Sequence, residues 1–188
     1  ENHLNSIMFK MIEIIEEIHK HLIIHRDIKP HNFMITPENN IHLIDFGLAN
    51  VENPELILTN ESRDLIVGTP NYISYNIHCG YDPLKRDDLI SIGYVFMFLS
   101  FGFLTWDSGS NVESETEPKE EENEYPNIHI LSHRLQKIKN KKKLENIIQQ
   151  CSPTMKKYFN YCYDLSCRKN IYYDGLKQLF MTDLHVTH

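Results

Sequence analysis

The sequence predicts a single, mainly α-helical domain that carries a short β-hairpin. Three observations lead to this fold class. Apolar residues recur at helical spacing between residues 8 and 22, two short β-type runs flank Pro37-Glu-Asn-Asn40, and an apolar stretch covers residues 89–106. With 188 residues, 41% hydrophobic and 24% charged, the chain has the composition of one globular domain with a real core.

The first predicted element is an amphipathic helix. Asn5 and Ser6 are good capping residues and precede it, and its outward positions are acidic or basic. Its apolar face follows the 3.6-residue period and comprises Met8, Met11, Ile12, Ile15, Ile18 and Leu22. After it, residues 33–36 and 41–44 predict a hairpin, and residues 45–76, with Gly and Pro punctuation, predict an ordered loop.

The second half of the chain is helical around one acidic segment. Residues 89–103 are apolar on all sides and predict a buried helix, which fits them better than a membrane span because the run is short and contains glycines and serines. Residues 108–127 are rich in Ser, Pro and Glu, and we expect a flexible acidic insert. Helical patterning returns at Ile128, with the lysines of residues 137–143 on an exposed face, and residues 155–163 and 173–183 predict two closing helices.

Composition excludes several function classes. A net charge of −7 argues against a nucleic-acid partner. The four cysteines form no C-x-x-C pair and lack histidines at zinc-finger spacing, so neither a disulfide framework nor a zinc site is indicated. The first residues lack the pattern of a signal peptide. We therefore expect an intracellular protein of the cytoplasm or nucleus, with no membrane partner.

Two motifs point to phosphoryl transfer. Residues 25–32 read His-Arg-Asp-Ile-Lys-Pro-His-Asn, and Asp45-Phe46-Gly47 follows after the predicted hairpin. The first matches the protein kinase catalytic loop H-R-D-x-K-x-x-N, and the second matches the metal-binding D-F-G motif. Both motifs in this order, after a helix and with a hairpin between them, resemble the catalytic core of a protein kinase.

The resemblance assigns roles to several polar residues of these motifs and to Thr69, in Gly68-Thr69-Pro70. Asp27 is expected to be the base that accepts the proton of the substrate hydroxyl, while Lys29 and Thr69 support the γ-phosphate of ATP. Asn32 and Asp45 are expected to bind Mg²⁺, which prefers carboxylate and carbonyl oxygens. ATP and Mg²⁺ are thus the expected cofactors, with Lys29, Asn32 and Asp45 contacting them.

Other positions take supporting roles in the same resemblance. Met34 falls where kinases place the residue beneath the adenine ring, and His25 and Phe46 fall where they stack a hydrophobic spine. Gly47 completes the D-F-G turn. Asp88, before the predicted buried helix, is expected to bond the backbone of the catalytic loop.

A longer stretch narrows the resemblance to the casein kinase 1 family. Residues 68–80 and 86–94 are similar to the pattern G-T-A-R-Y-A-S-I-N-x-H-x-G…R-D-D-L-E-S-L-G-Y of that family. In particular, Ser74-Tyr75-Asn76 stands where most kinases have Ala-Pro-Glu. This resemblance implies a serine/threonine protein kinase whose partners are ATP and proteins with Ser or Thr hydroxyls.

The sequence before the catalytic loop leaves an alternative open. It contains no Gly-rich phosphate loop and no lysine in a V-A-I-K context. We therefore expect residues 1–188 to form a kinase C-terminal lobe, a partial kinase domain whose N-terminal lobe is absent from the chain and would belong to a longer parent. The competing hypothesis is a non-catalytic half-kinase that acts as a binding or scaffold module.

Overall fold

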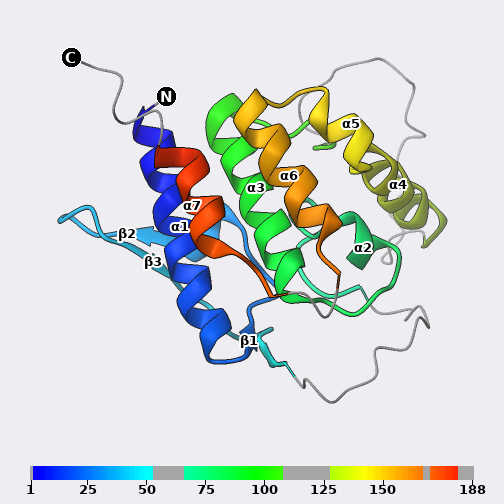
Figure 1. Cartoon of the computed structure of the whole chain (residues 1–188). Helices are drawn as coiled ribbons and strands as arrows, with labels where there is room; N and C mark the ends of the chain where they lie inside the picture. The colour runs from blue at the N-terminus through cyan, green and yellow to red at the C-terminus, as the bar shows by residue number, and fades with distance from the viewer. Residues whose placement is uncertain (1, 53–65, 108–127, 167–169, 182–188) are drawn as a thin grey trace.

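The computed structural model describes residues 2–52, 66–107, 128–166 and 170–181 (Figure 1). The acidic insert expected at 108–127 lies outside these residues. The helices are α1 (Asn2–Lys20), α2 (Tyr75–His78), α3 (Lys85–Phe101), α4 (Ile128–Lys141), α5 (Leu144–Ile148), α6 (Pro153–Asp164) and α7 (Tyr173–Met181). The strands are β1 (Ile23–Ile24), β2 (Phe33–Ile35), β3 (Ile41–Leu43) and β4 (Asn50–Val51). The mainly helical fold class is confirmed.

Helix α3 is the centre of the helical layer (Figure 1). It packs against α1 on one side and α6 on the other, and α1 also packs against α7. Residues 87–97 of α3 are all buried, which confirms the prediction of a helix surrounded by protein for this part, whereas Leu99 and Phe101 at its C-terminal end are 40% and 50% exposed. The helix begins at Lys85, four residues earlier than predicted, and ends at Phe101, before Gly102, whose φ of 79° lies in the left-handed region that favours glycine.

Helix α1 differs from its prediction at both ends. It begins at Asn2, and Asn5 lies inside the helix on its buried side instead of capping it. The predicted apolar face holds through Met8, Met11, Ile12 and Ile15, which are at most 1% exposed. Leu22 lies past the helix end at a φ of 59° and is 40% exposed, so its assignment to the apolar face was wrong.

Two small antiparallel sheets lie beside the helices. The predicted hairpin is present as β2 and β3, with Phe33 opposite Leu43 and Ile35 opposite Ile41. The second sheet pairs β1 with β4, which lies within the stretch predicted to be a loop. Two-residue strands show no periodicity in a sequence, so only the hairpin was predictable. The pairing of β1 with β4 brings the two ends of the segment between residues 25 and 50 together, and the hairpin lies within this segment.

The region around residue 142 corrects a prediction. Helix α4 extends from the expected start at Ile128, but the lysines of residues 137–143 do not all lie on one exposed face. Lys141 and Lys143 are exposed, whereas Lys142 is fully buried with 0% exposure. The chain turns at this point from α4 into α5, and the turn directs one lysine of the run inward.

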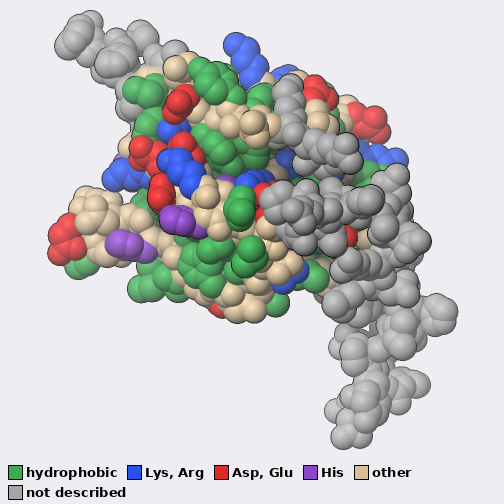
Figure 2. Space-filling model, turned by 60° about the horizontal axis from the view of Figure 1, so that its bottom comes forward, with side chains coloured by type: hydrophobic (Ala, Val, Ile, Leu, Met, Phe, Trp, Pro, Cys, Tyr) green, Lys and Arg blue, Asp and Glu red, His purple; other side chains and the backbone are tan. Residues whose placement is uncertain are grey.

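The surface mixes apolar and charged groups. Figure 2 shows the face near β1, where hydrophobic side chains lie among basic and acidic ones. Among the exposed large apolar residues are Met34, Ile35, Phe46, Leu48 and Val51. In the described part of the chain, no helix is long and apolar enough to cross a membrane.

Gly93 tests the contact between α3 and α6. A Cβ atom at this position would lie 2.6 Å from Cε1 of the buried Phe159 ring. We expect Gly93→Ala to lower the free energy of unfolding by about 1–3 kcal/mol, because the core is already filled. Urea denaturation followed by circular dichroism measures this. The control is Ser100→Ala at the exposed end of α3, and equal small effects of the two variants would contradict the close packing.

Candidate active site

The catalytic loop is held by one carboxylate. Asp88, in the first turn of α3, is 2% exposed. Its Oδ2 accepts a hydrogen bond from the backbone N–H of His25 at 2.8 Å, and its Oδ1 accepts one from the N–H of Arg26 at 2.9 Å. The side chain therefore joins the central helix to the start of the loop, as the family resemblance implies.

A histidine that the sequence analysis did not single out completes this anchor. The Nε2 of His19 lies 3.0 Å from Oδ2 of Asp88, and its Nδ1 lies 2.5 Å from the hydroxyl of Tyr173. Because a carboxylate accepts, Nε2 carries the proton and Nδ1 accepts from Tyr173. Burial, and then the charge of Asp88, raise the pKa of Tyr173, which keeps the hydroxyl protonated. The sequence signal for this role is the position of His19, a polar residue at helical spacing from the apolar residues Ile12 and Ile15.

The loop has an unusual backbone at Arg26. Its φ of 67° lies in the left-handed region, which costs a non-glycine residue about 1–2 kcal/mol. The bond from its N–H to Asp88 and a bond from its Nε to the carbonyl of Leu48 hold this conformation. Such strain persists only where the surroundings impose it, and it is concentrated at functional sites.

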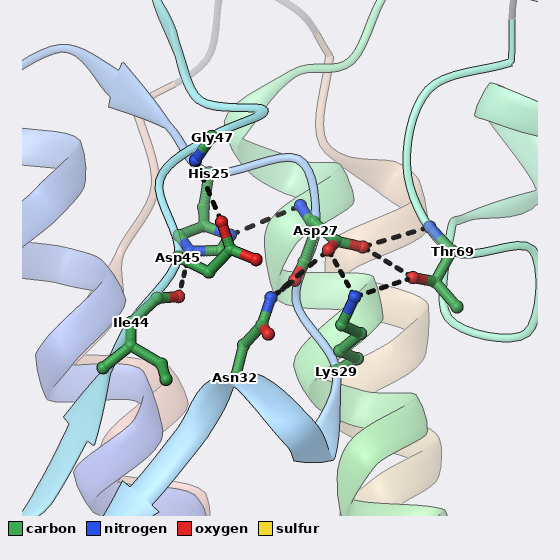
Figure 3. Close-up of polar contacts among 8 residues, drawn as sticks. All are labelled: His25, Asp27, Lys29, Asn32, Ile44, Asp45, Gly47 and Thr69. Carbon is green, nitrogen blue, oxygen red and sulfur yellow. Dashed lines mark hydrogen bonds and ion pairs between the residues drawn. The ribbon is translucent and has the colours of Figure 1, made fainter.

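Asp27 is the centre of a hydrogen-bonded cluster (Figure 3). Its Oδ2 accepts from Lys29 Nζ at 2.7 Å and from Asn32 Nδ2 at 3.3 Å. Its Oδ1 accepts from Thr69 Oγ1 at 2.7 Å and from the Thr69 N–H at 3.1 Å. In Figure 3, Lys29 and Thr69 lie on one side of Asp27, and Asn32 and Asp45 lie on the other. Four of the residues predicted from the motifs are thus in direct contact.

These contacts keep Asp27 ionised. Burial acts to raise the pKa of its carboxyl group, but the hydrogen bonds from Lys29, Thr69 and Asn32 outweigh burial and leave the pKa below its ordinary value. At neutral pH the group is therefore a carboxylate that can accept a proton or orient a hydroxyl. Its side chain is 8% exposed, so one edge of the cluster reaches the surface.

His25 links the two motifs. Its Nε2 lies 3.2 Å from the carbonyl oxygen of Ile44, and its Nδ1 accepts from the N–H of Asp27 at 3.3 Å. Since a carbonyl only accepts, Nε2 is the protonated nitrogen. The ring meets Phe46 edge-on, with the centroids 4.9 Å apart. The imidazole therefore fixes the positions of the catalytic loop and the D-F-G segment relative to each other.

Asp45 and Asn32 present oxygen atoms near the cluster. Asp45 has a φ of 65°, and its Oδ1 accepts from the N–H of Gly47 at 3.2 Å. Asn32 is buried and donates through Nδ2 to the carbonyl of Asp27 at 2.8 Å. Because Nδ2 is directed at Asp27, the amide oxygen is the atom that would meet a cation. Within the described residues, no group of three or more His, Cys, Asp or Glu could hold a metal ion.

Met34 is a predicted site residue that lies apart from the Asp27 cluster. It lies in β2 and is 55% exposed, beside Ile35, which is 60% exposed. Its side chain is therefore available to a ligand or to another part of a protein. Its predicted place beneath an adenine ring stays a prediction.

The segment that follows Thr69 is tied to α3 by a second aspartate. Ser74 caps α2 and donates to Oδ1 of Asp87 at 2.5 Å, while Oδ2 of Asp87 accepts from the N–H of Leu84 at 2.8 Å. Burial raises the pKa of Asp87, and the bonds from Ser74 and Leu84 act in the opposite direction. The Ser74-Tyr75-Asn76 sequence thus serves as an anchor, with the short helix α2 as its continuation.

Comparisons with known proteins agree with this geometry. The model of the protein kinase domain matches residues 1–174. Casein kinase I homolog 1 of Saccharomyces cerevisiae is 41% identical over 110 residues, which cover 54% of this chain and 20% of that protein. Casein kinase I homolog RAG8 of Kluyveromyces lactis is 36% identical over 140 residues, or 69% of this chain and 26% of that protein. The chain therefore spans about a quarter or less of the length of these relatives.

The Asp88 anchor makes a stability prediction. In Asp88→Asn, an N–H group replaces one of the two acceptors, which leaves a buried backbone donor unpaired. We expect the free energy of unfolding to fall by about 2–4 kcal/mol in urea denaturation. The control, Asp174→Asn, makes the same change in an exposed pair with Lys177 and is expected to have a much smaller effect, because water already screens that pair. Similar losses in both variants would contradict the anchor.

Proposed function

Because this chain belongs to the protein kinase family as a casein kinase 1-like member, we propose that it transfers the γ-phosphoryl group of ATP to serine and threonine hydroxyls of proteins. The single observation that carries this proposal is the cluster around Asp27. A carboxylate, an ammonium group and a hydroxyl meet there within hydrogen-bonding distance, next to two oxygen donors suited to a hard cation.

Each group has a role in this proposal. Phosphoryl transfer requires an in-line nucleophile and positive charge where negative charge develops. Asp27 orients the substrate hydroxyl and accepts its proton. Lys29, which lies 2.7 Å from Asp27 in the structure, turns to the γ-phosphate when substrates bind. Thr69 holds both side chains, since it donates to Asp27 and accepts from Lys29 at 3.4 Å. Lys29 at this position is typical of serine/threonine kinases.

The oxygen donors fit the expected cofactor. Protein kinases use ATP with Mg²⁺, and Mg²⁺ is commonly held by one or two protein oxygens together with phosphates and water. We assign this role to the carboxylate of Asp45 and the amide oxygen of Asn32. The metal supplies charge neutralisation at the phosphates. The Gly47 N–H orients the Asp45 carboxylate, and the Asp27 carbonyl orients the Asn32 amide.

The apolar surface beside the cluster suits the rest of the nucleotide. Met34 is exposed in β2, and Phe46 follows Asp45. We propose that Met34 contacts the adenine ring and that Phe46 extends the apolar contact from His25. Because the reaction uses cellular ATP, we place the protein in the cytoplasm or nucleus, with proteins that present Ser or Thr as its substrates.

A binding or scaffold module remains the competing function. Such a module would need the helical layer but not an ionised Asp27 bonded to Lys29 and Thr69. The hydrogen bonds from Lys29 and Thr69 hold Asp27 as a carboxylate that can accept a proton, and the strained backbone at Arg26 is of a kind concentrated at functional sites. These features support the enzyme over the module.

Asp27→Asn tests the proposal. In the full-length protein, we expect kcat for transfer of radiolabelled phosphate to a Ser/Thr substrate to fall by roughly 10² to 10⁴, the range typical of a general base. The change is nearly isosteric, so circular dichroism should remain unchanged. Asp174→Asn is the control and should keep wild-type kcat. Turnover of Asp27→Asn close to that of the wild type would remove Asp27 from the mechanism.

A further inference from the structure

Backbone carbonyls of the turn after Thr69 are bonded by side chains from distant parts of the chain. Lys142 Nζ donates to the carbonyl oxygens of Pro70 and Ile73, each at 2.7 Å. Trp106 Nε1 donates to the carbonyl of Asn71 at 2.8 Å, and His78 Nε2 lies 3.1 Å from the carbonyl of Pro70. We call these three side chains, Lys142, Trp106 and His78, the carbonyl clamp.

Lys142 is an unusual group to find in a core. It is 0% exposed, and its hydrogen-bond acceptors in the described part of the chain are carbonyl oxygens instead of a carboxylate. Its ammonium lies 4.9 Å from the centroid of the Tyr94 ring and 5.3 Å from that of Trp106. Burial lowers its pKa, whereas the carbonyls and the aromatic faces favour the charged form. Burying an ammonium costs several kcal/mol, so contacts of this quality are needed to hold it.

His78 acts in the clamp as a neutral donor. Burial, and then the charge of Lys142, lower the pKa of His78 to about 3. The ring is therefore uncharged at neutral pH, and its Nε2–H donates to the carbonyl of Pro70. Two donors consequently converge on one carbonyl, and the ring of His78 lies against Lys142, with Nε2 3.4 Å from Nζ.

The clamped turn leads directly to the candidate active site. The N–H groups of Tyr72 and Ile73 donate to the carbonyl of Thr69 at 2.8 and 3.1 Å, so the turn is closed on Thr69. The other side of Thr69 faces Asp27, to which it donates through both its hydroxyl and its N–H. A shift of the turn would therefore move both donors that hold Oδ1 of Asp27.

We propose that Lys142 is a positioning residue for the phosphoryl-transfer site. Together with Trp106 and His78 it holds the 69–74 turn in the conformation in which Thr69 bonds Asp27. This inference rests on the proposed kinase function for its effect on turnover, but the clamp itself can be measured without turnover. It connects the end of α4 to the catalytic loop, although Lys142 touches neither substrate nor nucleotide.

The test compares Lys142→Met with Lys143→Met in the full-length protein. Methionine keeps most of the aliphatic length and removes the three donors, and Lys143 is the exposed neighbour. In hydrogen exchange measured by mass spectrometry, we expect the peptide containing residues 69–74 to exchange at least about tenfold faster in Lys142→Met, with α3 unchanged. We expect kcat to fall at least about tenfold while the KM for ATP stays the same. Lys143→Met should match the wild type in both measurements.

The outcomes separate the possible failures. Unchanged exchange of the turn in folded Lys142→Met overturns the clamp. Faster exchange with wild-type kcat overturns the positioning role and leaves only a structural one. A wild type that transfers no phosphate refutes the proposed function, and exchange alone then decides whether the clamp holds the turn.

A second variant applies if Lys142→Met does not fold. Trp106→Phe keeps an aromatic ring in the core beside Tyr94 and removes the donor to Asn71 together with part of the buried ring volume. We expect faster exchange of the same peptide and a smaller fall in kcat. Wild-type exchange of the turn in this variant would overturn the proposal.

Discussion

The candidate site depends on the carboxylate of Asp88. One side chain accepts from two consecutive backbone N–H groups of the catalytic loop and from His19, and it does so from the first turn of a helix whose residues 87–97 are buried. The loop therefore takes its position from the core of the domain. The left-handed conformation of Arg26 follows from this anchor, because a strained residue remains strained only while its bonds hold it.

The neighbouring Asp87 anchors the segment that carries Thr69 to α3, as Asp88 anchors the catalytic loop. It binds Ser74, which begins α2 after the turn that carries Thr69, while Asp88 binds the loop that carries Asp27. Two adjacent aspartates of α3 thus fix the two segments whose side chains meet at the Asp27–Thr69 contact. Both lie near the N-terminus of α3, where the helix dipole favours negative charge. The carbonyl clamp supports the second segment from the opposite side, through Lys142.

Local patterns and motifs account for what the sequence could predict. The helical period identified α1, and a continuous apolar run identified α3. The catalytic motifs identified Asp27, Lys29 and Asn32, and the kinase resemblance added Thr69, all four of which the structure brings together. Other features depend on contacts between distant residues. Lys142 lies between two other lysines, and the carbonyls of Pro70 and Ile73 that hold it inward are far from it in the sequence. The role of His19 could not be predicted from its position in the helix alone, because its partners Asp88 and Tyr173 are far from it in the sequence.

The measurement that tests this account most directly is the turnover of Asp88→Asn in the full-length protein, at a temperature where circular dichroism shows it folded. Asp88 touches no substrate in the proposed mechanism, so its effect on kcat must pass through the position of the catalytic loop. We expect a fall of about 10²-fold, because small displacements of reacting groups have effects of this size. A folded Asp88→Asn variant with wild-type kcat would contradict the account.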